Sequence, residues 1–326
     1  MSLDQQNVVQ SLAEQSVTKI APREGYSKAL IELAKENPRI VALDGDCAKS
    51  NLTNLFGAAH PDRFFNLGIA EQDIVGTAAG LALGGKIPFA NAYANFLTGR
   101  AWDQMRISVC YSNMNVKLAG HNAGTSAAQE GATHLPFEDI ALMRALPRMT
   151  VIVPADSVEM EKAVRAAAEH EGPVYLRVGK LPVPVVTKPG DPFELGKARI
   201  LRTGSDVTIV TTGIMLYEAL LASEQLAKLG IAAEVIHAAT VKPLDTETIA
   251  ASAAKTKHVV TAEEHSVVGG LFGAVAEELA KVAPVKMKPV GNLDRFGFSG
   301  KMDELLDLLG MRAVNIVQAV LEVTGN

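Results

Sequence analysis

The sequence has few cysteines, few aromatic residues and no long hydrophobic run. Its two cysteines, Cys47 and Cys110, show neither metal-ligand spacing nor a disulfide framework, so we expect free thiols in a reducing, cytoplasmic setting. No segment approaches the apolar length of a membrane helix. The N-terminus has no basic start followed by an apolar run, so we expect no signal peptide.

A strong charge imbalance is also absent. The formal net charge of −5 at pH 7 indicates neither nucleic acid nor an anionic membrane as a partner. A small anionic ligand is still compatible with this charge, because a few local Arg and His residues can bind it. The 326 residues, 48% of them hydrophobic, are enough for two α/β domains of ordinary size.

Strands and helices alternate along the chain, which predicts an α/β fold with a mostly parallel sheet covered by helices. Buried-type strands are expected at 39–43, 87–90, 115–119, 150–154 and 173–178, and again at 207–210, 233–236 and 258–262. The second group predicts a smaller α/β C-terminal domain. Because 179–196 is rich in Pro and Gly, we place the domains at 1–187 and 188–326. Residues 1–20 are expected to be a polar lead-in or a short surface helix.

The segment 64–76 predicts a short strand, a tight turn at Gly68 and a helix that begins near Glu71. An acid in the first helical turn is often a solvated charge that the helix dipole favours. The alternative is a buried carboxyl that exchanges a proton with a ligand. The segment by itself leaves both interpretations open.

Polar residues follow several predicted strands, at the sheet edge where open α/β sheets bind ligands. Asp46 and Ser50 come after the strand at 39–43, although capping and turn formation explain them equally well. The stretch 120–134 is a long polar loop without hydrophobic periodicity. Loops of this length in compact domains are usually functional or disordered, and the two histidines and one glutamate within it favour function.

Four motifs stand in the order in which transketolases carry them, and the chain resembles the C-terminal part of that family. They are Gly68-Ile69-Ala70-Glu71-Gln72, Phe96-Leu97, Gly131-Ala132-Thr133-His134 and Lys242-Pro243-Leu244-Asp245. The resemblance covers the family's pyrimidine-binding and C-terminal domains. The Gly-Asp-Gly…Asn signature of its N-terminal domain, which binds a diphosphate and a divalent metal, has no counterpart, since Leu43-Asp44-Gly45-Asp46 has the wrong order.

The resemblance implies a transferase: the C-terminal subunit of a split, thiamin-diphosphate-dependent transketolase. Such an enzyme moves a two-carbon ketol unit from a ketose phosphate to an aldose phosphate, as in the pentose phosphate pathway. A partner N-terminal subunit would supply the diphosphate-binding domain and hold Mg²⁺ or Ca²⁺, so we expect no metal ligands here. An α₂β₂ heterotetramer is the default assembly, and the chain alone should show little activity.

The resemblance also assigns residue roles. Glu71 would hydrogen-bond the N1′ atom of the cofactor's aminopyrimidine, and His134 would be the second catalytic residue. The expected cofactor-binding residues are Asp46, Ile69, Glu71, Tyr93 and Phe96, with Phe96 stacked on the pyrimidine. The expected substrate-binding residues are Arg23, Ser50, His121, Glu130, His134 and Arg177, of which Arg23, Ser50, His121 and Arg177 face the phosphate. Glu130 stands where transketolases usually have Asp, which bears on acceptor preference.

Several alternatives stay open. The β-subunit of a 2-oxo acid dehydrogenase E1 component and a deoxyxylulose-phosphate synthase-like enzyme share much of the pattern, and a non-catalytic scaffold subunit would keep the fold. The Gly-Ala-Thr-His motif favours transketolase, and the presence of Glu71, Phe96 and His134 argues against a scaffold. We expect Glu263-Glu264-His265 to form a strand-end turn with helix capping, and the C-terminal domain to serve packing and assembly.

Overall fold

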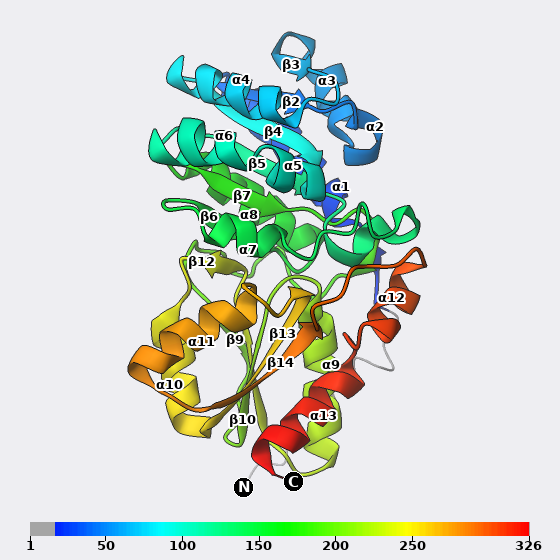
Figure 1. The fold of residues 1–326 in the computed structure, drawn as a ribbon, viewed down its shortest axis with the longest axis vertical. Helices are drawn as coiled ribbons and strands as arrows, with labels where there is room; N and C mark the ends of the chain where they lie inside the picture. Colours follow the sequence, from blue (N-terminus) through cyan, green and yellow to red (C-terminus); the bar gives the residue numbers. More distant parts are fainter. Residues whose placement is uncertain (1–16, 326) are drawn as a thin grey trace, which may run out of the picture.

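The computed structural model describes residues 17–325, so most of the lead-in predicted for residues 1–20 lies outside the described residues. At its end, Lys19–Ile20 forms a short strand instead of a surface helix. Two sheets, each flanked by helices, are stacked one above the other (Figure 1). Both sheets are mostly parallel, which confirms the predicted fold class. Within residues 17–325, the helices are all too short or too polar to span a bilayer.

The first sheet has seven strands in the order β12-β6-β7-β5-β4-β2-β3. Its strands are β2 (Ile40–Asp44), β3 (Phe64–Asn66), β4 (Ile87–Tyr93), β5 (Lys117–His121), β6 (Thr150–Ile152), β7 (Val174–Arg177) and β12 (Thr240–Lys242). All neighbours are parallel except β12, which pairs antiparallel with β6. A separate pair joins β1 (Lys19–Ile20) to β8 (Val183–Pro184).

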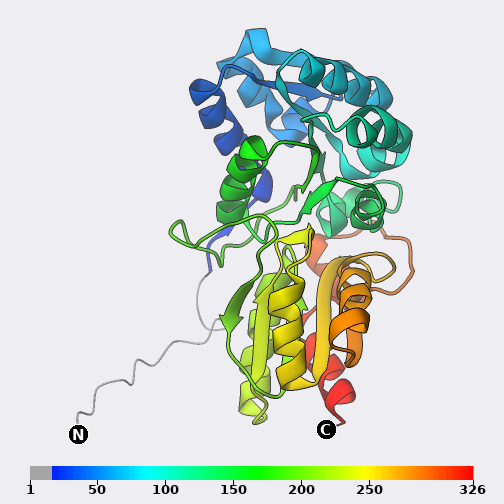
Figure 2. The same cartoon turned by 90° about the vertical axis from the view of Figure 1, so that its left-hand side faces the viewer.

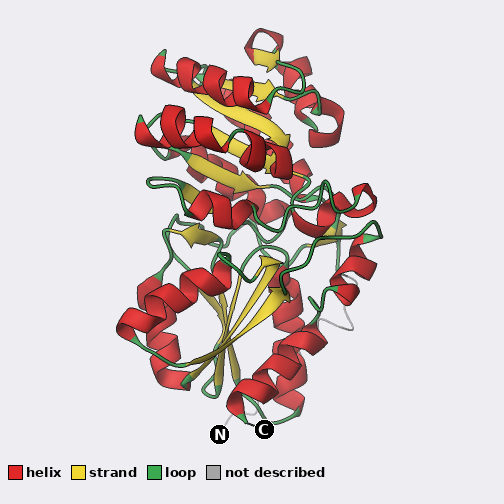
Figure 3. Ribbon diagram, viewed as in Figure 1, coloured by secondary structure: helices red, strands yellow, loops and turns green. Residues whose placement is uncertain are grey.

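Helices cover both faces of this sheet (Figure 3). One face packs against α1 (Pro22–Glu36), α3 (Thr53–Ala59) and α8 (Ser157–Glu169), and the other against α4 (Glu71–Leu83), α5 (Ala94–Arg100) and α7 (Asp139–Arg144). Burial on both faces explains why the strands are almost uniformly apolar. The short helix α2 (Ala48–Asn51) follows β2. The helical stretch that follows β4 is divided into α5, α6 (Trp102–Gln104) and a π-helical segment, Met105–Tyr111.

The second sheet has five strands in the order β14-β13-β10-β11-β9. They are β9 (Arg199–Arg202), β10 (Val207–Thr211), β11 (Ala233–His237), β13 (His258–Ser266) and β14 (Lys286–Asn292). One face packs against α9 (Met215–Lys228), α12 (Met302–Leu308) and α13 (Ala313–Thr324). The other packs against α10 (Thr246–Thr256) and α11 (Leu271–Val282), in a core that continues into the first sheet.

The two halves meet along a broad interface, visible in both side views (Figures 1 and 2). We propose the division at 1–187 and 188–326, between β8 and β9. The strand β12 crosses this division, because the second half contributes it to the edge of the first sheet. The strand β13 extends through Ser266 and includes Glu263, Glu264 and His265. The prediction of a turn at these three residues is therefore wrong.

Candidate active site

The predicted site residues gather at one edge of the first sheet. The strands β3, β2, β4, β5 and β7 are all parallel, so their carboxyl ends lie together. The residues that leave these ends are Asp46 and Ser50 after β2, Glu71 after β3, Tyr93 and Phe96 at the end of β4, His121 at the end of β5, and Lys180 after β7.

Glu71 is a buried carboxylate rather than a solvated helix-start charge. Gly68, with φ at +76°, makes the turn after β3, and Glu71 is the first residue of α4. The side chain is about 5% exposed. Arg100 Nη1 donates to both carboxylate oxygens, at 3.3 Å and 3.2 Å. The sequence reasoning missed Arg100, although its position one helical turn after Phe96 was a usable signal.

An aromatic cluster stands beside this carboxylate. The guanidinium carbon of Arg100 lies 4.1 Å from the centroid of the Phe96 ring. The ring of His134 meets Phe96 edge-on, with centroids 4.9 Å apart, and Tyr93 stacks on Phe96 at 6.3 Å. Asn95 Nδ2 donates to the carbonyl of the residue before His134 at 2.6 Å, which ties the 120–134 loop to α5. Glu71, Phe96 and His134 are therefore brought together as predicted.

A second group of predicted residues lies nearby and holds unpaired polar atoms. Arg23 Nη1 donates to the backbone oxygen of Ser50 at 2.6 Å. Among the described residues, the buried atoms Arg23 Nε, Ser50 Oγ and His121 Nδ1 have no hydrogen-bond partner. Buried polar groups are nearly always satisfied, so three orphans at one place are typical of a ligand site.

The tautomer of His121 follows from its neighbours. Asn91 Nδ2 donates to two backbone carbonyls, so its Oδ1 is the acceptor that His121 Nε2 faces at 3.0 Å. Burial and the charge of Arg23 lower the pKa of His121 to about 3, so the ring is neutral near pH 7. Nε2 therefore carries the proton, and the orphan Nδ1 is an acceptor. An acceptor suits a ligand hydroxyl better than an ionised phosphate oxygen.

Arg177 is not available to a phosphate, contrary to the prediction. Its Nε donates to Asp139 at 2.9 Å and its Nη1 to Glu264 at 3.0 Å, and the side chain is buried between these two carboxylates. The cation that reaches the site from β7 is Lys180, which the sequence reasoning missed. Lys180 Nζ lies 2.5 Å from Glu130. The preceding residue accepts a backbone hydrogen bond from Arg23 at 3.1 Å, so Lys180 and Arg23 are neighbours.

The remaining predicted residues frame the edge. Glu130 also accepts from Asn122 Nδ2 at 3.1 Å. Asp46 is exposed, has φ at +63° and accepts from Asn66 at 3.3 Å. Ile69 is 73% exposed directly before the start of α4. Burial, with the charges of Asp44, Glu71, Asp46 and Glu130, raises the pKa of the Cys47 thiol to about 12.

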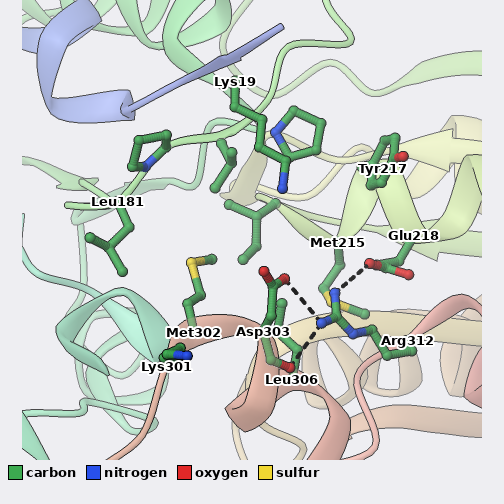
Figure 4. Close-up of a pocket in the computed structure, with 14 residues that line it drawn as sticks. Lys19, Leu181, Met215, Tyr217, Glu218, Lys301, Met302, Asp303, Leu306 and Arg312 are labelled. Atoms are coloured by element: carbon green, nitrogen blue, oxygen red, sulfur yellow. Dashed lines mark hydrogen bonds and ion pairs between the residues drawn. The ribbon is translucent and has the colours of Figure 1, made fainter. Parts of the chain in front are cut away.

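A pocket of about 270 Å³ lies elsewhere, between the β8 segment, α9 and α12 (Figure 4). Three of its charged groups are paired with one another, since Arg312 donates to Glu218 and Asp303 at 3.1 Å and 3.0 Å. No predicted site residue lines it. Across residues 17–325, the structure forms no cluster of three His, Cys, Asp or Glu side chains that could hold a metal ion.

A buried carboxylate beside an aromatic face, with unpaired polar atoms at the same sheet edge, defines one part of an enzyme site on a two-domain α/β chain. Comparison with known families agrees with this class. Residues 18–185 match the family "Transketolase, pyrimidine binding domain", and residues 196–316 match "Transketolase, C-terminal domain". The chain belongs to the transketolase family, as a C-terminal section.

Similar proteins of about the same length are described as subunits. A 6-deoxy-6-sulfo-D-fructose transketolase subunit of Clostridium sp. (strain MSTE9) is 45% identical, covering 93% of this chain and 94% of that protein. An apulose-4-phosphate transketolase subunit of Phocaeicola vulgatus is 37% identical, covering 93% of this chain and 97% of that protein. A solved structure described as the inactive β4 tetramer of a split-gene transketolase has a TM-score of 0.87 at 48% identity, covering 94% of this chain and 99% of that one.

Proposed function

We propose that this chain is the C-terminal subunit of a thiamin-diphosphate-dependent transketolase that works with a separate N-terminal subunit. The complex transfers a two-carbon ketol unit from a ketose phosphate to an aldose phosphate. One observation carries the proposal: the buried Glu71 carboxylate and the Phe96 ring stand at the same sheet edge as the orphan polar atoms of Arg23, Ser50 and His121.

The residues fit the pyrimidine half of thiamin diphosphate. A buried carboxylate next to an aromatic face matches a flat ring that carries a nitrogen donor. We assign Glu71 to the ring nitrogen, Phe96 to the ring face, and Asp46, Ile69 and Tyr93 to the surrounding wall. The cofactor supplies an electron sink for the two-carbon unit. Because no metal-ligand cluster forms within residues 17–325, we assign the diphosphate and its Mg²⁺ or Ca²⁺ to the partner.

The binding of pyrimidine to Glu71 requires Arg100 to move. Its guanidinium holds both carboxylate oxygens and lies against the Phe96 ring, which are the two surfaces assigned to the pyrimidine. The Arg100 side chain is about half exposed and can turn towards solvent, while the ring nitrogen of the pyrimidine takes its place as the partner of the buried Glu71.

For the substrate, we assign the phosphate to Arg23, Ser50 and Lys180. Arg23 donates to the Ser50 carbonyl, and its backbone N–H donates to the carbonyl of the residue that precedes Lys180. The neutral His121 accepts a substrate hydroxyl at Nδ1. His134, beside Phe96, is placed to exchange a proton with a hydroxyl near the reacting carbons. Glu130, already linked to Lys180, adjusts the choice of acceptor sugar.

Relatives described as subunits support a partner chain, and we propose an α₂β₂ heterotetramer in the cytoplasm that serves the pentose phosphate pathway. The test is reconstitution. This chain is mixed with an N-terminal section that carries Gly-Asp-Gly…Asn, with thiamin diphosphate and Mg²⁺, and offered pentose phosphates, then sulfofructose or apulose 4-phosphate. Ketol transfer in the mixture, with little from either chain alone, supports the proposal. Acyl or deoxysugar products, or no transfer, overturn it.

A further inference from the structure

The C-terminal domain reaches into the 120–134 loop through one buried side chain. Glu264, on β13, is about 5% exposed. One of its carboxylate oxygens accepts from the backbone N–H of Thr125 at 2.6 Å and also from the Thr125 hydroxyl. The loop approaches so closely that a Cβ on Gly124, where φ is +55°, would collide with the other oxygen. The backbone at Gly124 and Thr125 therefore packs directly against the Glu264 carboxylate.

The same carboxylate is linked to the end of the loop through Arg177. The second oxygen of Glu264 accepts from Arg177 Nη1 at 3.0 Å, and Arg177 Nη2 donates to the carbonyl of Pro136 at 3.4 Å. Two further contacts come from the C-terminal half, since Ser299 Oγ donates to the carbonyl of Gln129 at 2.7 Å and Ser266 N to that of Phe137 at 2.9 Å. The second domain thus holds the loop at Thr125 and Gln129, and it also holds Phe137, three residues after the loop.

We propose that Glu264 is a positioning residue for substrate binding, acting through the 120–134 loop. The proposal rests on the proposed function, in which that loop carries Glu130 and His134. Glu264 touches no substrate; it fixes the loop backbone at Thr125, five residues before Glu130. A buried, charge-assisted hydrogen bond is strong and directional, so it sets the loop's position rather than merely covering it. The C-terminal domain then has a part in selecting the acceptor sugar.

The deciding substitutions are on the loop side, because a change at the buried Glu264 also weakens its pairing with Arg177 and threatens folding. Thr125→Val removes the hydroxyl that Glu264 accepts from and keeps the shape, whereas Thr125→Ser keeps the hydroxyl. Glu264→Gln is the complementary change. Glu263→Gln is the matched control, because Glu263 is adjacent to Glu264 but caps the start of α11 and does not contact the loop through its hydrogen bonds.

Two measurements are made. In the isolated full chain, amide hydrogen exchange of the 120–134 peptides should be at least about fivefold faster in Thr125→Val and Glu264→Gln, and unchanged in Thr125→Ser and Glu263→Gln. In the reconstituted enzyme, kcat/KM for the acceptor should fall about tenfold, mostly through KM, while the affinity for thiamin diphosphate holds. The proposal is overturned if Thr125→Val, together with Glu264→Gln where that variant folds, shows the hydrogen exchange of the wild type and the wild-type KM for the acceptor. Absence of wild-type ketol transfer overturns the proposed function, while hydrogen exchange still tests the position of the loop.

Discussion

Two basic residues that follow each other closely at β7 have opposite roles. Arg177 is enclosed by Asp139 and Glu264, so its charge is neutralised within the fold. Lys180 is partly exposed, lies beside Arg23 and is paired only with the partly exposed Glu130. We therefore propose that Arg177 contributes to stability and Lys180 to ligand binding, and that mutants separate the two contributions.

Lys180→Met should raise KM for phosphorylated sugars in the reconstituted enzyme about tenfold or more and change kcat little. A charge-assisted hydrogen bond to a phosphate is worth about 1.5–3 kcal/mol, and Met keeps the aliphatic stem without the charge. Steady-state kinetics with a phosphorylated and an unphosphorylated acceptor measure the effect, since the unphosphorylated sugar lacks the contact. Equal KM changes for both sugars would refute the assignment.

Arg177→Met should instead destabilise the chain by about 3–5 kcal/mol, because it leaves Asp139 and Glu264 as buried charges without their partner. Urea unfolding of the isolated chain, followed by circular dichroism, measures the change. Arg165→Met is the matched control, since Arg165 lies on the surface of α8 and pairs only with an exposed Glu36. If Arg177→Met lowers the free energy of unfolding no more than Arg165→Met does, the buried ion pairs of Arg177 do not stabilise the chain as predicted.

At the scale of elements, Glu263 links the end of β13 to the start of α11. Its carboxylate accepts from the backbone N–H groups of Leu271 and Phe272 at 2.6 Å and 2.8 Å. Burial is the main cause that raises the pKa of Glu263 to about 8. Since the ordinary value is 4.5, the folded chain binds a proton between pH 4.5 and 8 that the unfolded chain releases.

The stabilising effect of that proton is therefore complete below about pH 4.5 and is lost as the pH rises towards 8. In Glu263→Gln, which cannot titrate, the free energy of unfolding should fall less between pH 5 and pH 8 than in the wild type, by on the order of 1 kcal/mol or more. Urea midpoints of both proteins at the two pH values give the comparison. Identical pH dependence would show that Glu263 titrates normally.

The order of strands and helices could be predicted because the central strands of the first sheet are buried on both faces and consist mostly of apolar residues. The strand β14 could not be predicted, since its sequence KMKPVGN contains two lysines, a proline and a glycine and shows no clear alternation of apolar and polar residues. The long segment after Phe96 has helical periodicity, and periodicity alone does not reveal its division into α, α and π segments.

For the site, the sheet edge was predictable because loops at the carboxyl ends of parallel strands must converge. The ion-pair partners of the charged residues could not be predicted. Arg177 pairs with residues 38 and 87 positions away, and nothing local distinguishes it from a surface cation. The pairing of Arg100 with Glu71 across 29 positions is likewise a tertiary fact. The roles of Glu71, His134 and the other assigned residues stay predictions.

At the scale of the whole molecule, we propose that this chain carries one side of a site. Glu71, Phe96 and the orphan polar atoms stand at an open edge, while Ile69 beside them is 73% exposed. A second chain that covered this edge would bury Ile69 and enclose the Glu71 carboxylate. We therefore propose that the active site lies between subunits and that activity is a property of the assembly.

The most direct test of this central claim is ketol transfer by the reconstituted complex with wild-type chain or Glu71→Gln. Gln keeps the size of Glu71 and removes its charge, so the complex should assemble as before, which native mass spectrometry checks. We predict transfer by the wild-type complex and a loss of at least about a thousandfold in kcat for Glu71→Gln. Near-normal turnover by an assembled Glu71→Gln complex would contradict the account.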